Sequence, residues 1–294
     1  MKAVNNSELT AYRDCAYRWG RRYVDKLEPD APEEFGVMDW GSAYHALQEV
    51  LWDTKSLRMA QEAAGAVLPP GQTEALEEIN WCLEFYAASA ADELASWVVL
   101  GTEVRIAVNL GHGLLYYGTI DLLVWDPIHK RIIIVDHKST GADVAGYEGR
   151  ISLDTQSAGY TWLVQEALRL GWLKGFPCIE ANPAIAFQWH VVRRKLPSTP
   201  QVNKDGKVSV RAIDTLPTVY AAALEQQVFS RGITATEDQV ALLASLRGRE
   251  HSWFRVTEHY VSAGEVERWR LEARATVSMA RAMERRHSSP LAWP

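Results

Sequence analysis

Cysteine is scarce in this chain, and long apolar runs are missing altogether. The three cysteines among the 294 residues, Cys15, Cys82 and Cys178, are too few and too widely spaced for a disulfide framework. We therefore expect a reducing, cytoplasmic setting. No apolar stretch approaches the roughly 20 residues that cross a bilayer, and the N-terminus lacks the apolar core of a signal peptide. We expect no association with membranes.

An excess of positive charge is also missing, because the formal net charge is −6 at pH 7. This excludes a protein that coats nucleic acid through its overall charge alone. Basic residues nevertheless gather in two segments, and six of them lie between positions 191 and 211: Arg193, Arg194, Lys195, Lys204, Lys207 and Arg211. The N-terminal segment adds Arg13, Arg18, Arg21, Arg22 and Lys26. Such local basic surfaces suit a phosphate backbone, although solvated basic faces are the ordinary alternative.

The apolar periodicity predicts alternating helices and strands. We expect helices near 6–24 (capped by Asn6 or Ser7), from 39 through GSAYHALQEVLW, and near 72–97, 153–170, 218–229, 236–246 and 263–286. Strands are expected near 98–110, within a hairpin at 118–140, and near 177–192 and 253–260. The segment 28–34 reads as a linker, and 141–149 and 196–215 as loops. This order predicts an α/β fold whose mixed central sheet is flanked by helices, with helical additions at both ends.

We interpret the chain as a single domain in three parts. Residues 1–97 form an N-terminal helical part, 98–195 form the core, and 196–294 form a C-terminal part of loop and helices. The core contains the most informative stretch, GTIDLLVWDPIHKRIIIVDHKST at 118–140. Its two apolar strands are joined by a turn in which proline fixes one dihedral angle and aspartate can cap locally. The β-branched run before Asp136 is typical of a strand that is covered on both faces.

Two carboxylates and one lysine interrupt this apolar hairpin. Asp136 and Lys138 are two residues apart, so they project from the same face of a strand, and antiparallel pairing can bring Asp121 beside them. Burying an unpaired carboxylate costs on the order of several kcal/mol, and two carboxylates repel each other. A divalent cation neutralises such a pair, so the pattern indicates metal-dependent phosphodiester cleavage. The alternative is a hairpin with solvated carboxylates and an ordinary Asp–Lys ion pair.

Other polar residues lie on the neighbouring predicted elements. His45 shares a helix face with Gly41, although a single histidine there is more often structural than a ligand. Glu103 lies within the strand before the hairpin and is either a third acid or an exposed strand residue. Gln156 and Tyr160 lie on one face of the helix that follows.

Taken together, these motifs resemble the PD-(D/E)XK nuclease superfamily, and within it the RecB-like exonucleases. The resembling segments, in chain order, are GSAYH at His45, the strand acid Glu103, GTID at Asp121, DHK at Asp136 and Lys138, and QSAGY at Gln156 and Tyr160. Five weak motifs in the right order make a strong joint signal across about 5–260. The later RRKLPSTPQVNKDGKVS and AIDT are similar to phage-encoded members of the CRISPR-associated RecB-like exonucleases.

The resemblance implies a restriction-endonuclease-like core and Mg²⁺- or Mn²⁺-dependent hydrolysis of DNA from its ends. It implies Asp121 and Asp136 as metal ligands, with Glu103 and His45 as outer or second-metal ligands. Lys138 would position or deprotonate a water, or hold the phosphate, while Gln156 and Tyr160 would orient the substrate or the lysine. The basic residues Arg18, Arg21, Arg22, Arg193, Arg194 and Lys195 would contact DNA.

One departure concerns an iron–sulfur cluster, which many members of that branch bind through one N-terminal and three C-terminal cysteines. Cys15 lies at the N-terminal position, but no cysteine follows Cys178, so we expect no four-cysteine cluster from this chain. Linear DNA is the expected partner, together with recombination or replication proteins. A non-catalytic DNA-binding subunit of the same fold, or an endonuclease, are the alternative interpretations.

Overall fold

The computed structural model describes residues 3–27, 36–111, 113–147, 149, 154–176, 182–211 and 213–287. At its centre is a six-stranded mixed sheet. The strands are β1 (Ala3–Val4), β2 (Val98–Gly111), β3 (Leu114–Asp126), β4 (Arg131–Thr140), β5 (Ala184–Arg193) and β6 (Phe254–His259). Their order is β1-β3-β4-β5-β6, with β2 paired to the long strand β3. The expected mixed sheet is therefore confirmed.

The predicted hairpin is the middle of this sheet. β3 and β4 are antiparallel, and β4 and β5 are parallel because the helix α8 (Gln156–Arg169) lies between them in the chain. Asp126 holds the hairpin turn, since its carboxylate accepts hydrogen bonds from the backbone N–H groups of Ile128 and His129. The turn therefore forms where the sequence predicts it.

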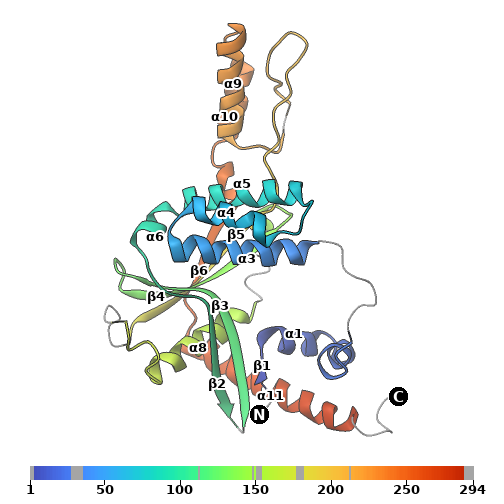
Figure 1. Ribbon diagram of the computed structural model, residues 1–294, viewed down its shortest axis with the longest axis vertical. Helices are drawn as coiled ribbons and strands as arrows, with labels where there is room; N and C mark the ends of the chain where they lie inside the picture. Colours follow the sequence, from blue (N-terminus) through green and yellow to red (C-terminus); the bar gives the residue numbers. More distant parts are fainter. Residues whose placement is uncertain are drawn as a thin grey trace.

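Helices cover both faces of the sheet (Figure 1). One face carries α3 (Val37–Thr54), α4 (Leu57–Val67), α5 (Thr73–Ser89) and α6 (Ala91–Ser96), and the other carries α8 and α11 (Ala263–His287). Successive residues of β4 alternate between the two cores: Ile132 and Ile134 pack toward α8 and α11, and Ile133 and Val135 toward α3 and α5. A fully apolar run is what a strand covered on both faces requires.

The N-terminal helix differs from the expected single helix over 6–24. It consists of α1 (Asn6–Asp14), α2 (Ala16–Trp19) and a π-helical turn, Gly20–Val24. Cys15 breaks it with an extended backbone, and its sulfur accepts a hydrogen bond from the backbone of Arg18. The capping residue is Asn5 rather than Asn6 or Ser7. Asn5 leaves β1 in an extended conformation, so its side chain can accept the hydrogen bond from the Glu8 N–H.

The expected helix over 72–97 is also wrong as one element. Ala90 leaves the helical conformation and is buried in the core, which divides the segment into α5 and α6, while Trp97 is extended. The sequence interpretation omitted α4, which begins where the Ser56 hydroxyl accepts a hydrogen bond from the backbone of Met59. The predicted linker 28–34 lies outside the described residues.

The chain between β5 and β6 forms a projecting unit that we call the arm, the described residues between 196 and 246. It contains α9 (Pro217–Arg231) and α10 (Glu237–Ser245) and extends away from the sheet (Figure 1). A small core of its own holds it together, made by Val208, Tyr220, Leu224 and Leu246. None of the described helices is long and apolar enough to cross a membrane.

Candidate active site

Strand register brings the three predicted acids into one row. The two residues that flank Glu103 in β2 pair with the two residues that flank Asp121 in β3, so Glu103 lies opposite Asp121 across the pair. Across β3 and β4, the pairing of Leu122 with Val135 places Asp121 level with Asp136. The row follows from the period-2 geometry of strands, since a slip of one residue would turn these side chains to the opposite face.

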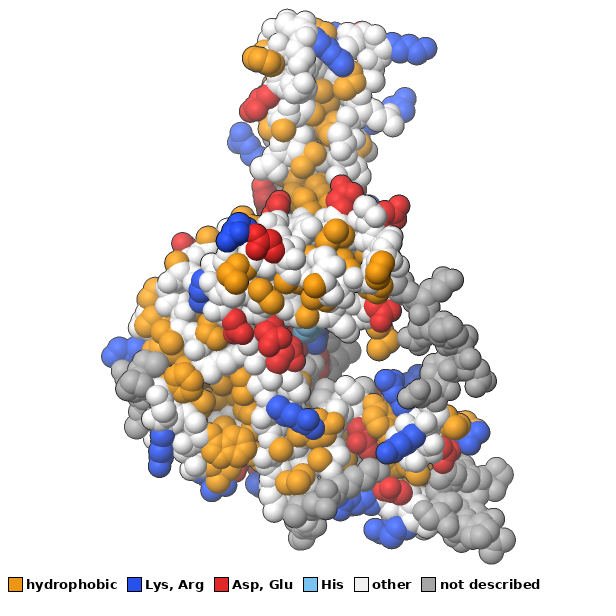
Figure 2. All heavy atoms as spheres, viewed as in Figure 1, with side chains coloured by type: hydrophobic (Ala, Val, Ile, Leu, Met, Phe, Trp, Pro, Cys, Tyr) orange, Lys and Arg blue, Asp and Glu red, His pale blue; other side chains and the backbone are white. Residues whose placement is uncertain are grey.

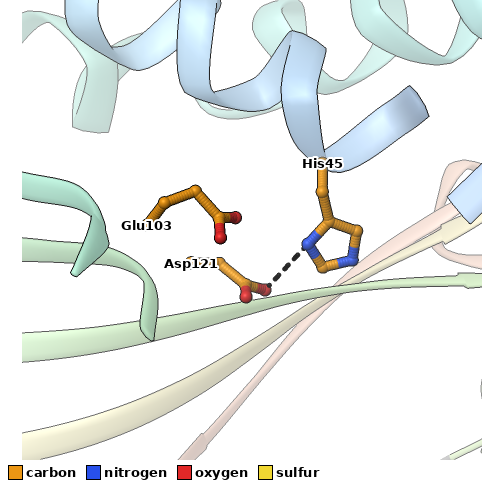
Figure 3. A group of neighbouring side chains, drawn as sticks. All are labelled: His45, Glu103 and Asp121. Atoms are coloured by element: carbon orange, nitrogen blue, oxygen red, sulfur yellow. Dashed lines mark ion pairs between the residues drawn. The ribbon is translucent and has the colours of Figure 1, made fainter. Parts of the chain in front are cut away.

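His45, Glu103 and Asp121 converge at the edge of this row (Figure 3). His45 reaches down from α3, and its Nδ1 lies 3.3 Å from Asp121 Oδ2. One ligand atom from each of the three residues lies within 4.8 Å of the others. Three sequence-distant elements thus contribute one donor each.

Glu103 occupies a left-handed backbone conformation, with φ of +47° in the middle of β2. A non-glycine residue in this region costs on the order of 1–3 kcal/mol and persists where the surrounding structure imposes it. The irregular backbone leaves Glu103 exposed beside a carboxylate that is largely buried. Strain of this kind is typical of functional sites.

The charges of these three groups are coupled. Burial lowers the pKa of His45, but the hydrogen bond and charge of Asp121 outweigh it, so the pKa is raised. Burial raises the pKa of Asp121, but His45 outweighs it and the pKa is lowered. Burial and the charge of Asp121 raise the pKa of Glu103. The site therefore concentrates negative charge that one imidazole balances only in part.

Asp136 lies next to this group and is held by other partners. Its side chain is 1% exposed, its Oδ2 lies 2.6 Å from Lys138 Nζ, and its Oδ1 accepts a hydrogen bond of 2.8 Å from Gln156 Nε2. Gln156 Oε1 in turn accepts one of 3.4 Å from Lys138. Burial raises the pKa of Asp136 to about 6 although Lys138 opposes the shift. The structure thus joins the predicted Asp, Lys and Gln and leaves Asp136 outside the three-donor group.

The donor set fits a hard divalent cation. Two carboxylates and one imidazole supply the oxygen and nitrogen ligands that Mg²⁺ and Mn²⁺ accept, and Asp136 adds a further oxygen nearby. A cation here would also relieve the repulsion that raises the pKa of Glu103. The sequence prediction of four ligands thus has three in one group and the fourth beside it.

Tyr160, the last of the predicted catalytic residues, packs against the sheet, and its role in orienting the substrate or the lysine stays a prediction. Its side chain is 8% exposed and lies against the backbone of Gly118 on β3. Burial raises the pKa of its hydroxyl. It therefore fixes the distance between α8 and the sheet, and so the position of Gln156 at the start of the same helix.

A buried polar network behind β4 was not predicted from the sequence. The Tyr86 hydroxyl lies 3.0 Å from His190 Nδ1, 3.3 Å from His137 Nε2 and 3.1 Å from Trp52 Nε1. Burial lowers the pKa of His137 to about 3, so it stays neutral. The backbone N–H of His137 also donates to Asp121 Oδ2 at 2.7 Å. This network supports the strand that carries Asp136 and Lys138. The only signal for it in the sequence is the histidine inside DHK.

The predicted basic residues have different surroundings. Arg193 is 9% exposed and donates two hydrogen bonds to Asp214, which Lys195 also contacts at 2.7 Å. Arg194 lies over the ring of Trp40, 5.7 Å from its centre. Among the N-terminal arginines, Arg21 pairs with Asp25, while Arg18 and Arg22 line a cavity beside Gln156. Contact of these residues with DNA stays a prediction.

Comparison with known protein families identifies one match, the PD-(D/E)XK nuclease superfamily, over residues 3–287. No curated protein matches the chain. The match covers nearly the whole length and includes every predicted site residue. Proteins of this superfamily are nucleases that use divalent metal ions, in agreement with the acidic group at His45, Glu103 and Asp121. The chain therefore belongs to the PD-(D/E)XK nuclease superfamily.

Proposed function

We propose that this protein is a metal-dependent DNA exonuclease of the RecB-like branch, which hydrolyses phosphodiester bonds from DNA ends with Mg²⁺ or Mn²⁺. The observation that carries the proposal is the convergence of His45, Glu103 and Asp121 beside the Asp136–Lys138 pair. A phage origin, and recombination or replication proteins as partners, belong to the same resemblance.

Each predicted catalytic or metal-binding residue has a proposed role, and that of Tyr160 is to hold the helix that carries Gln156 against the sheet. Asp121 and Asp136 would hold the metal ion, and Glu103 and His45 would complete its surroundings. A bound ion supplies a water of lowered pKa and positive charge beside the scissile phosphate. Lys138 holds that water or the phosphate, because its ammonium already lies against Asp136. Gln156 keeps Asp136 and Lys138 in place through its two hydrogen bonds.

The reaction is a hydrolysis. The water oxygen bonds to phosphorus, the bond from phosphorus to one sugar oxygen breaks, and that oxygen leaves as an alcohol after taking up a proton. The residues orient the reactants and stabilise the charge that develops on the phosphate.

Incubation with two forms of DNA tests the exonuclease assignment. We expect end-labelled linear DNA to be degraded with Mg²⁺ or Mn²⁺, covalently closed circles to survive, and EDTA to stop the reaction. Rapid nicking of the circles would favour an endonuclease. Binding without any metal-dependent cleavage would favour a non-catalytic DNA-binding subunit.

Two substitutions test the site itself. Asp136→Asn keeps the shape of the side chain but removes its charge, and we expect cleavage to fall at least about a thousandfold, which corresponds to roughly 4 kcal/mol of transition-state stabilisation. Lys138→Ala should lower cleavage similarly while calorimetric metal binding persists. Asp238→Asn, an exposed acid in α10, is the matched control. Wild-type cleavage by Asp136→Asn would overturn the site assignment.

A further inference from the structure

A cavity of about 810 Å³ lies between the N-terminal helices and the start of α8. Figure 2 shows the molecule hollowed between α3 and the N-terminal helices, with Lys and Arg side chains gathered on the N-terminal side. One wall consists of polar and basic residues of α1, α2 and the π-helical turn, among them Asn6, Ser7, Thr10, Arg13, Arg18 and Arg22. The opposite wall is the segment Asp154, Thr155 and Gln156.

The cavity leads to the reactive groups. Gln156 is part of its wall and is also the residue that donates to Asp136 and accepts from Lys138. A molecule in the cavity is therefore separated from the buried Asp136 by one amide side chain. Because the cavity adjoins the site without containing the metal-binding group, it can hold substrate that extends beyond the reacting bond.

The lining favours an anion. Its three arginines outnumber its two acids, and neither acid is a strong competitor for them. Asp14 contacts Arg18 at 3.5 Å in a pair whose side chains are 67% and 58% exposed, and such surface pairs are weak. Asp154 already accepts a backbone hydrogen bond of 2.7 Å from Gln156.

Flat and apolar groups lie among these charges. The Arg22 guanidinium lies 5.6 Å from the centre of the Tyr23 ring, and both residues line the cavity with Met38, whose side chain is largely exposed. Cations that grip a backbone, interleaved with groups on which bases stack, are the features of sites for single-stranded nucleic acid. A cavity of this volume has the size of a site for a drug-sized ligand, and so for a few nucleotides.

We propose that this cavity binds a short single-stranded segment of DNA next to the scissile phosphodiester, so that the enzyme takes hold of an unpaired end. This inference rests on the proposed nuclease function for its biological meaning, but binding can be measured without cleavage. Arg18 and Arg22 contact the backbone, and Tyr23 and Met38 contact bases.

The test uses full-length protein and a fluorescent single-stranded oligonucleotide in EDTA, with salt varied. We expect Arg18→Gln with Arg22→Gln to weaken binding at least about tenfold and to reduce the slope of log K against log salt by about 0.7 for each lost phosphate contact. The matched control is Arg58→Gln with Arg169→Gln. It removes two exposed, ion-paired arginines outside the cavity. Circular dichroism and thermal melting check the fold, and Arg22→Lys, which keeps the charge, should retain most of the binding.

A second measurement compares blunt duplexes with duplexes that carry a short unpaired tail. We expect wild type to cleave the tailed substrate faster and the cavity variant to lose this preference. If the cavity variant and the control variant bound the single strand with the same affinity and the same salt slope, the inference would be overturned. Loss of cleavage in Asp136→Asn would still leave the nuclease assignment intact. Conversely, cavity-dependent binding in a protein without metal-dependent cleavage would uphold the inference and refute the proposed function.

Discussion

Glu103 combines two unfavourable features at one residue. Its backbone is left-handed at φ of +47°, and partial burial of its carboxyl group, together with the neighbouring charge of Asp121, raises its pKa. Neither feature serves the fold, because a glycine would adopt this conformation without steric cost. Both are understandable if the carboxylate is needed at that position for a metal ion.

Two substitutions at Glu103 separate strain from charge. Glu103→Gln removes the charge alone, whereas Glu103→Gly also relieves the strained backbone, offset in part by the greater freedom of glycine in the unfolded chain. We expect the Gly variant to be more stable than the Gln variant by up to about 1 kcal/mol in urea unfolding. Both variants should bind Mn²⁺ more weakly than wild type in calorimetry. A Gly variant less stable than the Gln variant would show that the left-handed conformation is not a source of strain.

At the scale of elements, the site depends on the close approach of α8 to β3. A Cβ atom on Gly118 would lie 2.6 Å from a ring carbon of Tyr160 and 2.8 Å from a methyl carbon of Leu163. Glycine therefore allows α8 to rest against the strand, and Gln156 at the start of this helix reaches Asp136 as a result. The packing of α8 against Gly118 thus sets the position of the Gln156 amide in the site.

Gly118→Ala tests this dependence. We expect it to destabilise the protein by about 1–3 kcal/mol, the usual cost of overpacking a core, and to lower cleavage because α8 and Gln156 are displaced. Urea unfolding and initial rates on linear DNA measure the two effects. Gly65→Ala is the control: the residue is exposed in the last turn of α4, and a Cβ added there would have no neighbouring atom within 4 Å, so the substitution should stabilise by up to roughly 0.5–1 kcal/mol. Equal stability changes in the two variants would contradict the close approach.

At the scale of the whole molecule, an ion cluster ties the base of the arm to the sheet. Asp214, on the arm, accepts two hydrogen bonds from Arg193 at the end of β5 and one from Lys195. The hydrogen bonds from Arg193 lower the pKa of Asp214 to about 2, although burial opposes them. A basic segment that the sequence indicated as a DNA contact thus also fixes the base of the arm.

The depressed pKa gives a definite pH dependence. The carboxylate of Asp214 contributes stability above its unfolded pKa of 3.8, and this contribution is lost as the pH falls toward about 2. We expect Asp214→Asn to be less stable than wild type at pH 7, with the difference shrinking between pH 4 and pH 2. Urea unfolding at several pH values measures it. Asp205→Asn is the control, since the carboxylate of this exposed arm acid lies 3.8 Å from the Lys207 ammonium and otherwise accepts a backbone hydrogen bond that asparagine can also accept. A difference that stays constant with pH would refute the ion-cluster explanation.

The sequence by itself determined the hairpin and the common face of Asp136 and Lys138. The β-branched run before Asp136 can be buried on both faces, and the residues of β4 do alternate between the two cores. The two-residue spacing of Asp136 and Lys138 fixed their common face, and the turn at Asp126 fixed the register that brings Asp121 level with Asp136. These features are local, so short-range pattern was sufficient to predict them.

The tertiary structure alone decided which polar groups meet. The packing of α3 on the sheet brings His45 and Asp121 together, and the position of the arm brings Asp214 into an ion pair with Arg193. The strained conformation of Glu103 and the cavity beside Gln156 likewise depend on several elements at once. The physical reason is that a charged side chain pairs with whichever opposite charge the packed elements bring near it. Hydrophobic burial sets that packing, and the spacing of charges along the chain does not encode it.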